Sequence, residues 1–361
     1  RVVRDVDLCS VYAPGVYEAG SRRLWKMVEE GGFVQEKAPV YYLYELTMDG
    51  RTQTGLVACA SIDDYQNHVI KKHENTREEK ELDRIRHVEA CRAQTGPIFL
   101  TYRAQEEIRV LTEAVKKEEP EFSFVSEDGI RHRGWKIWQE ETIRILSEAF
   151  GRLDSIYIAD GHHRAASAVK AGINRREQCP GYTGEEEFNY FLSVLFPDDE
   201  LMIMDYNRLV KDLNGLSEEA FLEKVDEKFD RTVLPAEGKP HRKGQIYLYP
   251  NRKWYELTTR EAFRRDDPVG SLDVSYLQRE LLQPVLGIED PRTDPRMDFV
   301  GGVRCLMELE QGADRCGGAA FVMYPTSIQE LFQVSDAGLL MPPKSTWFEP
   351  KLRSGLFIHG I

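Results

Sequence analysis

The sequence predicts a mixed protein of the α/β or α+β class. Short apolar runs alternate with amphipathic helical segments, and one unit, residues 156–172, has the pattern of a strand, a tight turn and a helix. The 361 residues are 41% hydrophobic and 30% charged, which is typical of a folded protein with a sizeable core. We expect two domains: residues 1–200 form a core that bears the motifs, and residues 201–361 form a second α+β part whose C-terminal block packs back on that core.

The first part of the chain shows regular elements after a weakly patterned start. Val40–Leu46 and Leu56–Ile62 are typical of a hairpin, because Asp49-Gly50 between them suits a tight turn. A polar loop, Val69–Arg77, follows and leads into an amphipathic helix. The other elements expected here are helices at Ser21–Glu30, Glu78–Ala93, Glu106–Lys117 and Glu140–Phe150, and strands at Ile98–Tyr102, Glu121–Val125 and Ile130–Trp138.

The second part of the chain mixes strands and helices with proline-rich loops. Residues 264–270 and 289–296 are polar and contain proline, so we expect surface loops there. The expected strands are Asn189–Phe196, Leu201–Met204, Ile246–Tyr249, Trp254–Leu257 and Ala319–Tyr324, and the expected helices are Glu218–Phe229, Val274–Leu282, Asp298–Leu309 and Ser327–Val334. Prolines at 342, 343 and 350 exclude a regular helix or a central strand in the C-terminal block.

Charge and cysteine usage narrow the class of function. The net charge of −13 argues against a protein that binds nucleic-acid backbones, since such binding depends on basic patches. The sequence contains no apolar run of membrane-spanning length and no signal peptide, and it starts at an arginine, so we expect a processed chain or part of a longer one. Six scattered cysteines without a Cys-x-x-Cys pair indicate reduced thiols in a cytoplasmic protein. The oligomeric state stays open.

The strand–turn–helix unit carries the densest set of polar groups. Its sequence from residue 156 to residue 168 is IYIADGHHRAASA, so Asp160 and Gly161 form the turn and His162, His163 and Arg164 open the helix. Unpaired N–H groups at a helix start, the helix dipole and a guanidinium together favour an anion, most naturally phosphate. The alternative is that Asp160 only caps the helix and the histidines are solvated.

Two other stretches concentrate polar residues. The loop at 73–77 holds His73 and Glu74, and the C-terminal block holds Lys344 and Lys351. For each of them the alternative is an ordinary solvated loop charge. The sequence has no Gly-x-x-x-x-Gly-Lys-Ser/Thr phosphate loop, no Gly-x-Gly-x-x-Gly turn and no His-Glu-x-x-His pattern.

Several blocks resemble one family over nearly the whole chain. They are HENT at 73–76, CRAQTGPIF at 91–99, IADGHHR at 158–164, YPTS at 324–327 and MPPKSTWFEPK at 341–351. In this order they are similar to the prokaryotic family defined by domain of unknown function 1015. Ala165 stands where that family usually has an aromatic residue, and the family's opening Pro-Pro-Tyr-Asp-like block is not found.

The turn itself has a more distant resemblance. Gly-x-His-Arg at a helix start is similar to the signature of the ParB/sulfiredoxin-like nucleotide-binding fold, which includes free serine kinases. That resemblance implies a nucleotide-phosphate site at Gly161–Arg164. Sulfiredoxins carry a reactive cysteine where this chain has His162, and the acidic chain lacks the basic helices of ParB proteins. What remains by analogy of fold is a kinase that acts on a small molecule.

These observations lead to an expected chemistry, the transfer of a phosphoryl group from ATP or ADP to a small hydroxylated metabolite. Arg164, Gly161 and His163 would hold phosphate with Lys344 and Lys351, and His162 would donate to the transferring group. Asp160 would hold Mg²⁺, and Glu74, beside His73, would be the base. One alternative is a nucleotide-sensing or protein-binding module without catalysis. Another is a metal hydrolase that uses His73, His162 and His163.

Overall fold

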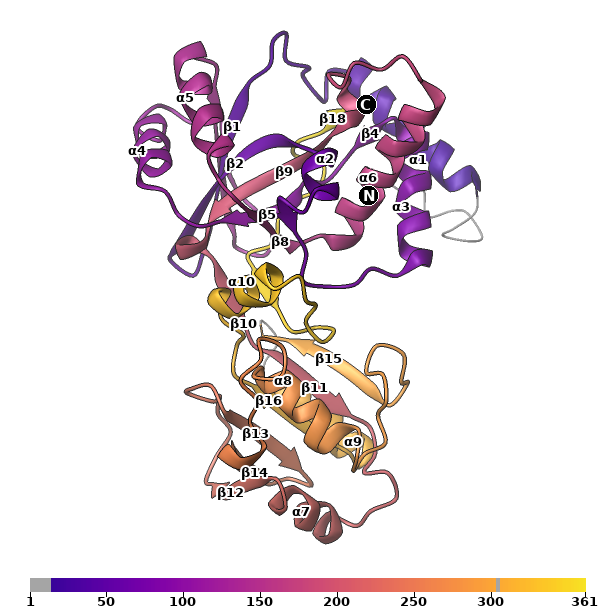
Figure 1. Cartoon of the computed structure of the whole chain (residues 1–361), viewed down its shortest axis with the longest axis vertical. Coiled ribbons are helices and arrows are strands. Elements are labelled where there is room, and N and C mark those ends of the chain that lie inside the picture. Colours follow the sequence, from indigo (N-terminus) through magenta and orange to yellow (C-terminus); the bar gives the residue numbers. More distant parts are fainter. Residues whose placement is uncertain (1–13, 303–305) are drawn as a thin grey trace. The chain divides into compact units, whose positions relative to one another are not determined.

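The protein consists of two compact units in the computed structural model, which describes residues 14–302 and 306–361 (Figure 1). The first unit runs to Leu201 and takes in Pro350–Ile361 as well, and the second unit is Met202–Glu349. Both combine helices with β-sheet, which confirms the mixed α/β class. No helix in the described ranges is long and apolar enough to cross a membrane.

The first unit is built on an eight-stranded mixed sheet with the order β3-β8-β5-β9-β2-β1-β7-β6. Strands β3 and β8 are parallel, as are β5 and β9, and the other neighbours are antiparallel. The strands of this sheet are β1 (Tyr41–Met48), β2 (Arg51–Ser61), β3 (Ile70–Lys71), β5 (Ile98–Tyr102), β6 (Phe122–Val125), β7 (Arg131–Ile137), β8 (Ile156–Asp160) and β9 (Tyr190–Pro197). A separate two-stranded sheet pairs β4 (Ala93–Gln94) with β18 (His359–Gly360). The helices are α1 (Pro14–Glu29), α2 (Ile62–Gln66), α3 (Glu78–Cys91), α4 (Glu106–Val115), α5 (Glu140–Gly151) and α6 (His162–Gln178), with single 3₁₀ turns at Glu187–Asn189 and Asp198–Glu200.

Helix α6 packs on this sheet through small side chains. Ala165, Ala168 and Val169 belong to the same buried cluster as Ile158 of strand β8. The sequence predicts that the helix ends at Gly172, and that prediction is wrong, because α6 continues to Gln178. A Cβ atom at Gly172 would lie 2.4 Å from the carbonyl oxygen of Phe188, so this glycine permits a close approach inside the helix instead of ending it.

The C-terminal segment Pro350–Ile361 is an integral part of the first unit. Strand β18 pairs with β4, and the N–H of Gly355 donates to the carbonyl of Thr95 at 2.7 Å. The ring of Phe357 lies 5.4 Å from the ring of Tyr42 and 5.6 Å from that of Tyr44, centroid to centroid. Residues at the end of the sequence therefore share a unit with strand β8 and helix α6.

The second unit is built on a six-stranded antiparallel sheet with the order β12-β14-β13-β16-β11-β15. A separate two-stranded ribbon pairs β10 (Met202–Met204) with β17 (Trp347–Glu349). The sheet strands are β11 (Tyr206–Val210), β12 (Phe229–Leu234), β13 (Gln245–Pro250), β14 (Trp254–Thr259), β15 (Met297–Gly301) and β16 (Ala319–Met323). The helices are α7 (Glu218–Asp226), α8 (Asp273–Leu277), which continues as a π-helical turn at Gln278–Leu282, α9 (Leu306–Cys316) and α10 (Ile328–Asp336), with a 3₁₀ turn at Glu261–Phe263.

One expected helix of this unit is a strand instead. The sequence predicts a helix at Asp298–Leu309, but Met297–Gly301 forms the edge strand β15, and α9 begins at Leu306. Strand β15 pairs with β11, and Met297 and Val300 are buried. Pairing with a distant strand overrides the local pattern here.

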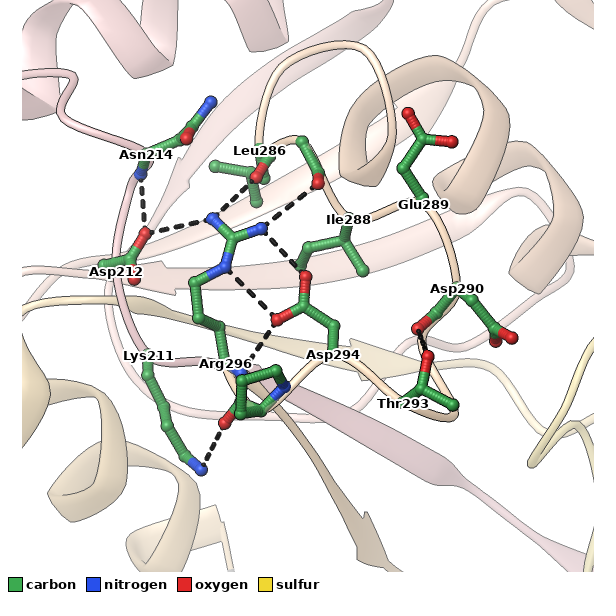
Figure 2. Close-up of polar contacts among 12 residues, drawn as sticks. Lys211, Asp212, Asn214, Leu286, Ile288, Glu289, Asp290, Thr293, Asp294 and Arg296 are labelled. Carbon is green, nitrogen blue, oxygen red and sulfur yellow. Dashed lines mark hydrogen bonds and ion pairs between the residues drawn. The ribbon is translucent and has the colours of Figure 1, made fainter.

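The expected surface loop at 289–296 is held by an arginine whose donors have partners (Figure 2). The guanidinium of Arg296 pairs with Asp294 at 2.9 Å and with Asp212 at 3.4 Å. It also donates to the carbonyls of Leu286 and Gly287, at 3.0 and 3.1 Å. Arg296 is thus an arginine with a structural role, and it provides a comparison for the arginines of the first unit.

Candidate anion-binding site at the start of helix α6

Gly161 makes the turn between strand β8 and helix α6 possible. Its backbone has φ 95° and ψ 28°, a left-handed conformation that favours glycine. A Cβ atom at this position would lie 2.9 Å from Nε and 3.0 Å from Nη2 of Arg164. The guanidinium of Arg164 therefore folds back over the turn, and the turn has room for it only because residue 161 lacks a side chain.

Asp160, the last residue of β8, is an ionised carboxylate with two partners. Its Oδ1 accepts the N–H of Gly161 at 2.9 Å, and its Oδ2 pairs with Nζ of Lys351 at 3.3 Å. Burial acts to raise the pKa of Asp160, but the charges of Lys351 and Arg164 and the hydrogen bond from Gly161 outweigh it and hold the pKa below its ordinary value. The C-terminal segment thus places a lysine at the motif.

The two histidines of the motif bind the loop at residues 73–77. Nε2 of His162 accepts the backbone N–H of His73 at 3.4 Å, and Nε2 of His163 accepts the backbone N–H of Arg77 at 3.0 Å. An accepting Nε2 carries no proton, so each ring can donate only from Nδ1. The structure therefore brings the HENT loop and the DGHHR turn together, and a donor role of either histidine toward phosphate would have to use Nδ1.

His73 is a buried, neutral imidazole at this junction. It is 2% exposed, and its ring meets that of His162 edge-on, with 4.5 Å between the ring centroids. Burial lowers the pKa of His73 to about 4, although the charge of Asp160 and a hydrogen bond with the backbone of Ile158 oppose this shift. Glu74 follows it and is half-buried; its role as a base stays a prediction.

Arg164 lines a cavity of about 540 Å³ between helices α3 and α6. The guanidinium is half-buried, and it has neither a hydrogen bond nor an ion pair with any residue that the structure describes. Burial lowers the pKa of Arg164; the charge of Asp160 opposes this shift and the charge of Arg84 adds to it. The cavity is lined by Asp83, Arg84, His87, Val88, Gln94, Thr95, Gly96, Ile98, Arg164, Ser167, Ala168 and Ser354. A partly desolvated guanidinium that faces a cavity without a partner is a natural place for an anion.

Comparison with known proteins identifies the family. Residues 5–275 match the family of proteins of unknown function DUF1015, which is three quarters of the chain. The chain belongs to the DUF1015 family. The membership predicted from the sequence blocks is confirmed, whereas the more distant ParB/sulfiredoxin-like label stays a prediction. A search of the curated proteins finds no match for this DUF1015 protein.

Solved structures give three further likenesses for this DUF1015 protein. A free serine kinase in complex with AMP is 14% identical, with a TM-score of 0.40, and the match covers 81% of this chain and 86% of that one. SbnI with a C-terminal truncation, from Staphylococcus aureus, is 12% identical, with a TM-score of 0.42 and coverage of 84% and 87%. A conserved hypothetical protein from Pyrococcus furiosus is 13% identical, with a TM-score of 0.39 and coverage of 82% and 93%.

Lys344 belongs to the second unit, whereas the other predicted site residues of this DUF1015 protein belong to the first. Its backbone is left-handed at φ 60°, and its carbonyl accepts a hydrogen bond from Nη2 of Arg208 at 3.1 Å. Its Nζ lies 5.8 Å from the ring centroid of Tyr206. A role for Lys344 in binding a cofactor therefore stays a prediction.

Arg84 and Ser354 are among the cavity residues of this DUF1015 protein that sequence reasoning missed. Arg84 is one of several charges on helix α3, and only the fold shows that it faces the same cavity as Arg164. Ser354 lies almost two hundred positions after Arg164 and reaches the cavity because the C-terminal segment returns to the first unit. The CRAQTG part of a family block was a usable signal, since Gln94, Thr95 and Gly96 line the cavity.

The arrangement around Asp160 bears on the expected metal. No group of three or more His, Cys, Asp or Glu side chains suited to a metal ion occurs in the described part of the DUF1015 chain. Asp160 is a half-exposed, ionised carboxylate that already has a cation, the ammonium group of Lys351, beside it. The role of Asp160 as a ligand of Mg²⁺ therefore stays a prediction. The alternative of a three-histidine metal site gains no support, because Nε2 of both His162 and His163 already accepts a backbone N–H.

Proposed function

We propose that this protein binds a nucleotide, ATP or ADP, through its phosphates at Gly161–Arg164 and transfers a phosphoryl group to a small hydroxylated metabolite. The observation that carries this proposal is the state of Arg164, a half-buried guanidinium that faces a cavity of about 540 Å³ and has no partner among the described residues. A charge left in that state has a cost unless a ligand compensates it. A phosphate group does so well, because two of its oxygens match the planar fork.

The neighbouring groups supply what phosphoryl transfer requires. Helix α6 starts at His162, so its first N–H groups and its dipole add to the positive potential over the turn. Lys351 brings an ammonium group to Asp160, from which it can turn to a phosphate. Mg²⁺, held by Asp160, would neutralise charge on the phosphates. Glu74 is the proposed base for the acceptor hydroxyl, because it sits in the loop that both motif histidines bind.

A second candidate function is a nucleotide sensor without catalysis. It is favoured by the contacts of His162 and His163 with the backbone at His73 and Arg77, which couple the helix start to a loop. A ligand at the turn would then change the position of that loop. Binding assays do not separate the two functions, whereas an assay of phosphoryl transfer to a panel of hydroxylated metabolites does.

Arg164→Lys tests the phosphate site. It keeps the charge and removes the fork, and a charge-assisted hydrogen bond contributes about 1.5–3 kcal/mol, so nucleotide affinity is expected to fall roughly ten- to hundredfold. Isothermal titration with ADP and ATP, with and without Mg²⁺, measures this fall. The control is Arg86→Lys, an exposed arginine on α3 that is not part of the cavity wall.

The melting temperature of the same variants separates binding from bracing. A phosphate ligand predicts weaker binding and a nearly unchanged melting temperature without nucleotide. If Arg164 instead braces the turn through Asp160, the variant melts lower and keeps its affinity. If neither quantity changes, or if the wild-type protein binds neither nucleotide, the proposed function is wrong.

A further inference from the structure

We infer that the cavity between α3 and α6 binds a ligand with two neighbouring anionic groups, and that Arg84 is the residue that selects for the second one. This inference rests on the proposed phosphate site at Arg164. The shared chemistry is a small molecule with two anions, which are either adjacent phosphates or a phosphate and a carboxylate. Arg84 takes one anionic group and Arg164 takes the other.

Arg84 resembles Arg164 in having no partner. It is exposed, it lines the cavity, and it has no hydrogen bond or ion pair with the residues that the structure describes. Its neighbour Asp83, which lines the cavity too, forms no ion pair with it: consecutive helical residues do not face each other, and Oδ1 of Asp83 accepts the hydroxyl of Tyr17 at 2.7 Å. Arg296 of the second unit, by contrast, has two carboxylates and two carbonyls around its guanidinium.

Two cations that share a cavity repel each other. The charge of Arg84 is one of the causes that lower the pKa of Arg164, which means that the two guanidinium groups interact. In a chain with a net charge of −13, carboxylates are available to neutralise arginines, as the other ion pairs of the first unit illustrate. Two guanidinium groups that line one cavity, neither of them in a hydrogen bond or ion pair with the described residues, are therefore suited to a ligand that brings two negative charges together.

The floor of the cavity leaves room for such a ligand beside Arg164. A Cβ atom at Gly96 would lie 2.8 Å from Oγ of Ser354 and 3.5 Å from Nη1 of Arg164. Glycine at this position thus keeps the approach to the guanidinium free, and the hydroxyl of Ser354 adds a polar group to the same wall. Val88 and Ile98 line the cavity too, which fits a compact organic part of the ligand.

Arg84→Gln tests the inference in the full-length protein by isothermal titration at fixed ionic strength. The probes are inorganic phosphate, pyrophosphate and 2-phosphoglycolate, which carry one phosphate, two phosphates, and a phosphate with a carboxylate. The matched control is Arg86→Gln, which removes the same charge from the same helix at a position outside the cavity wall. We expect Arg84→Gln to weaken the binding of a two-anion probe about ten- to hundredfold and to leave phosphate affinity nearly unchanged. Arg86→Gln is not expected to show this selective loss of affinity for the two-anion probe.

The outcomes separate this inference from the function on which it rests. If the wild-type protein binds pyrophosphate in preference to 2-phosphoglycolate, the two anions are adjacent phosphates, and the reverse order identifies a phosphorylated acid. If all three probes bind alike, or if the two variants lose equal affinity, the inference on Arg84 is wrong while the phosphate site stands. If none of the probes binds to the wild-type protein, both fail.

Discussion

Gly161 carries two constraints at once, and they can be separated by experiment. Alanine there has to adopt φ 95° and also meets the guanidinium of Arg164. Gly129, in the turn before strand β7, has φ 78°, and a Cβ atom there would have nothing within 4 Å, so Gly129→Ala has the backbone cost alone, about 1–2 kcal/mol. We expect Gly161→Ala to lose more stability in urea than Gly129→Ala and also to weaken phosphate binding. Equal losses with unchanged binding would contradict the packing of Arg164 on the turn.

His73 makes the stability of the first unit depend on pH. Its pKa is about 4 in the folded protein and ordinarily 6.5, so between these values the unfolded chain binds a proton that the folded chain does not. The contribution of neutral His73 to the free energy of unfolding is complete above pH 6.5 and is lost as the pH falls toward 4. The difference of the two pKa values corresponds to about 3 kcal/mol over this window.

His73→Gln should remove this dependence. We expect a flatter plot of unfolding free energy against pH for the variant, measured with urea from pH 4 to pH 7. The pKa of His132 is also lowered by burial, so the wild-type protein has more than one contribution and the difference between the two plots is the quantity to compare. Asp160, the charge that faces His73, has a lowered pKa and stays ionised over most of the window. Parallel plots would show that His73 does not titrate as stated.

At the scale of elements, the sequence predicts those parts whose signals are local. Strand β8, the turn at Gly161 and the start of α6 follow from an apolar run, a glycine and helix-forming residues in direct succession. The polar loop before α3 is visible in the same way. Non-local effects decide where local reasoning fails: β15 is a strand because β11 pairs with it, and Gly172 stays within α6 because Phe188 packs against it.

In the candidate site, too, some residues have a local sequence signal and others do not. Asp160 and Arg164 are detectable because four different polar groups follow one buried strand. The contacts of His162 and His163 with loop 73–77 join positions almost ninety residues apart, so composition and spacing give no sign of their geometry. Arg84 and Ser354 have no local signal at all, since a charged helix and a polar C-terminal segment are common on protein surfaces.

At the scale of the whole molecule, the second unit is an insertion into the first. The chain leaves the first unit after Leu201 and returns at Pro350, and the ribbon of β10 and β17 pairs Met202 with Glu349. Paired residues of antiparallel strands have Cα atoms about 5 Å apart, so a short turn is able to bridge the two ends. The residues assigned to the phosphate site, except Lys344, all belong to the first unit.

Replacing Met202–Glu349 by Asn-Gly is therefore expected to give a folded protein that keeps the phosphate site. The expected result is a cooperative unfolding transition and a phosphate affinity close to that of the full chain. Arg164→Lys should weaken phosphate binding in the shortened protein as it does in the full chain, and this comparison is the internal control. If the shortened protein folds but no longer binds phosphate, the second unit contributes to the site, and Lys344 is then the first residue to substitute in the full chain, because its ammonium group is among the cations that the deletion removes.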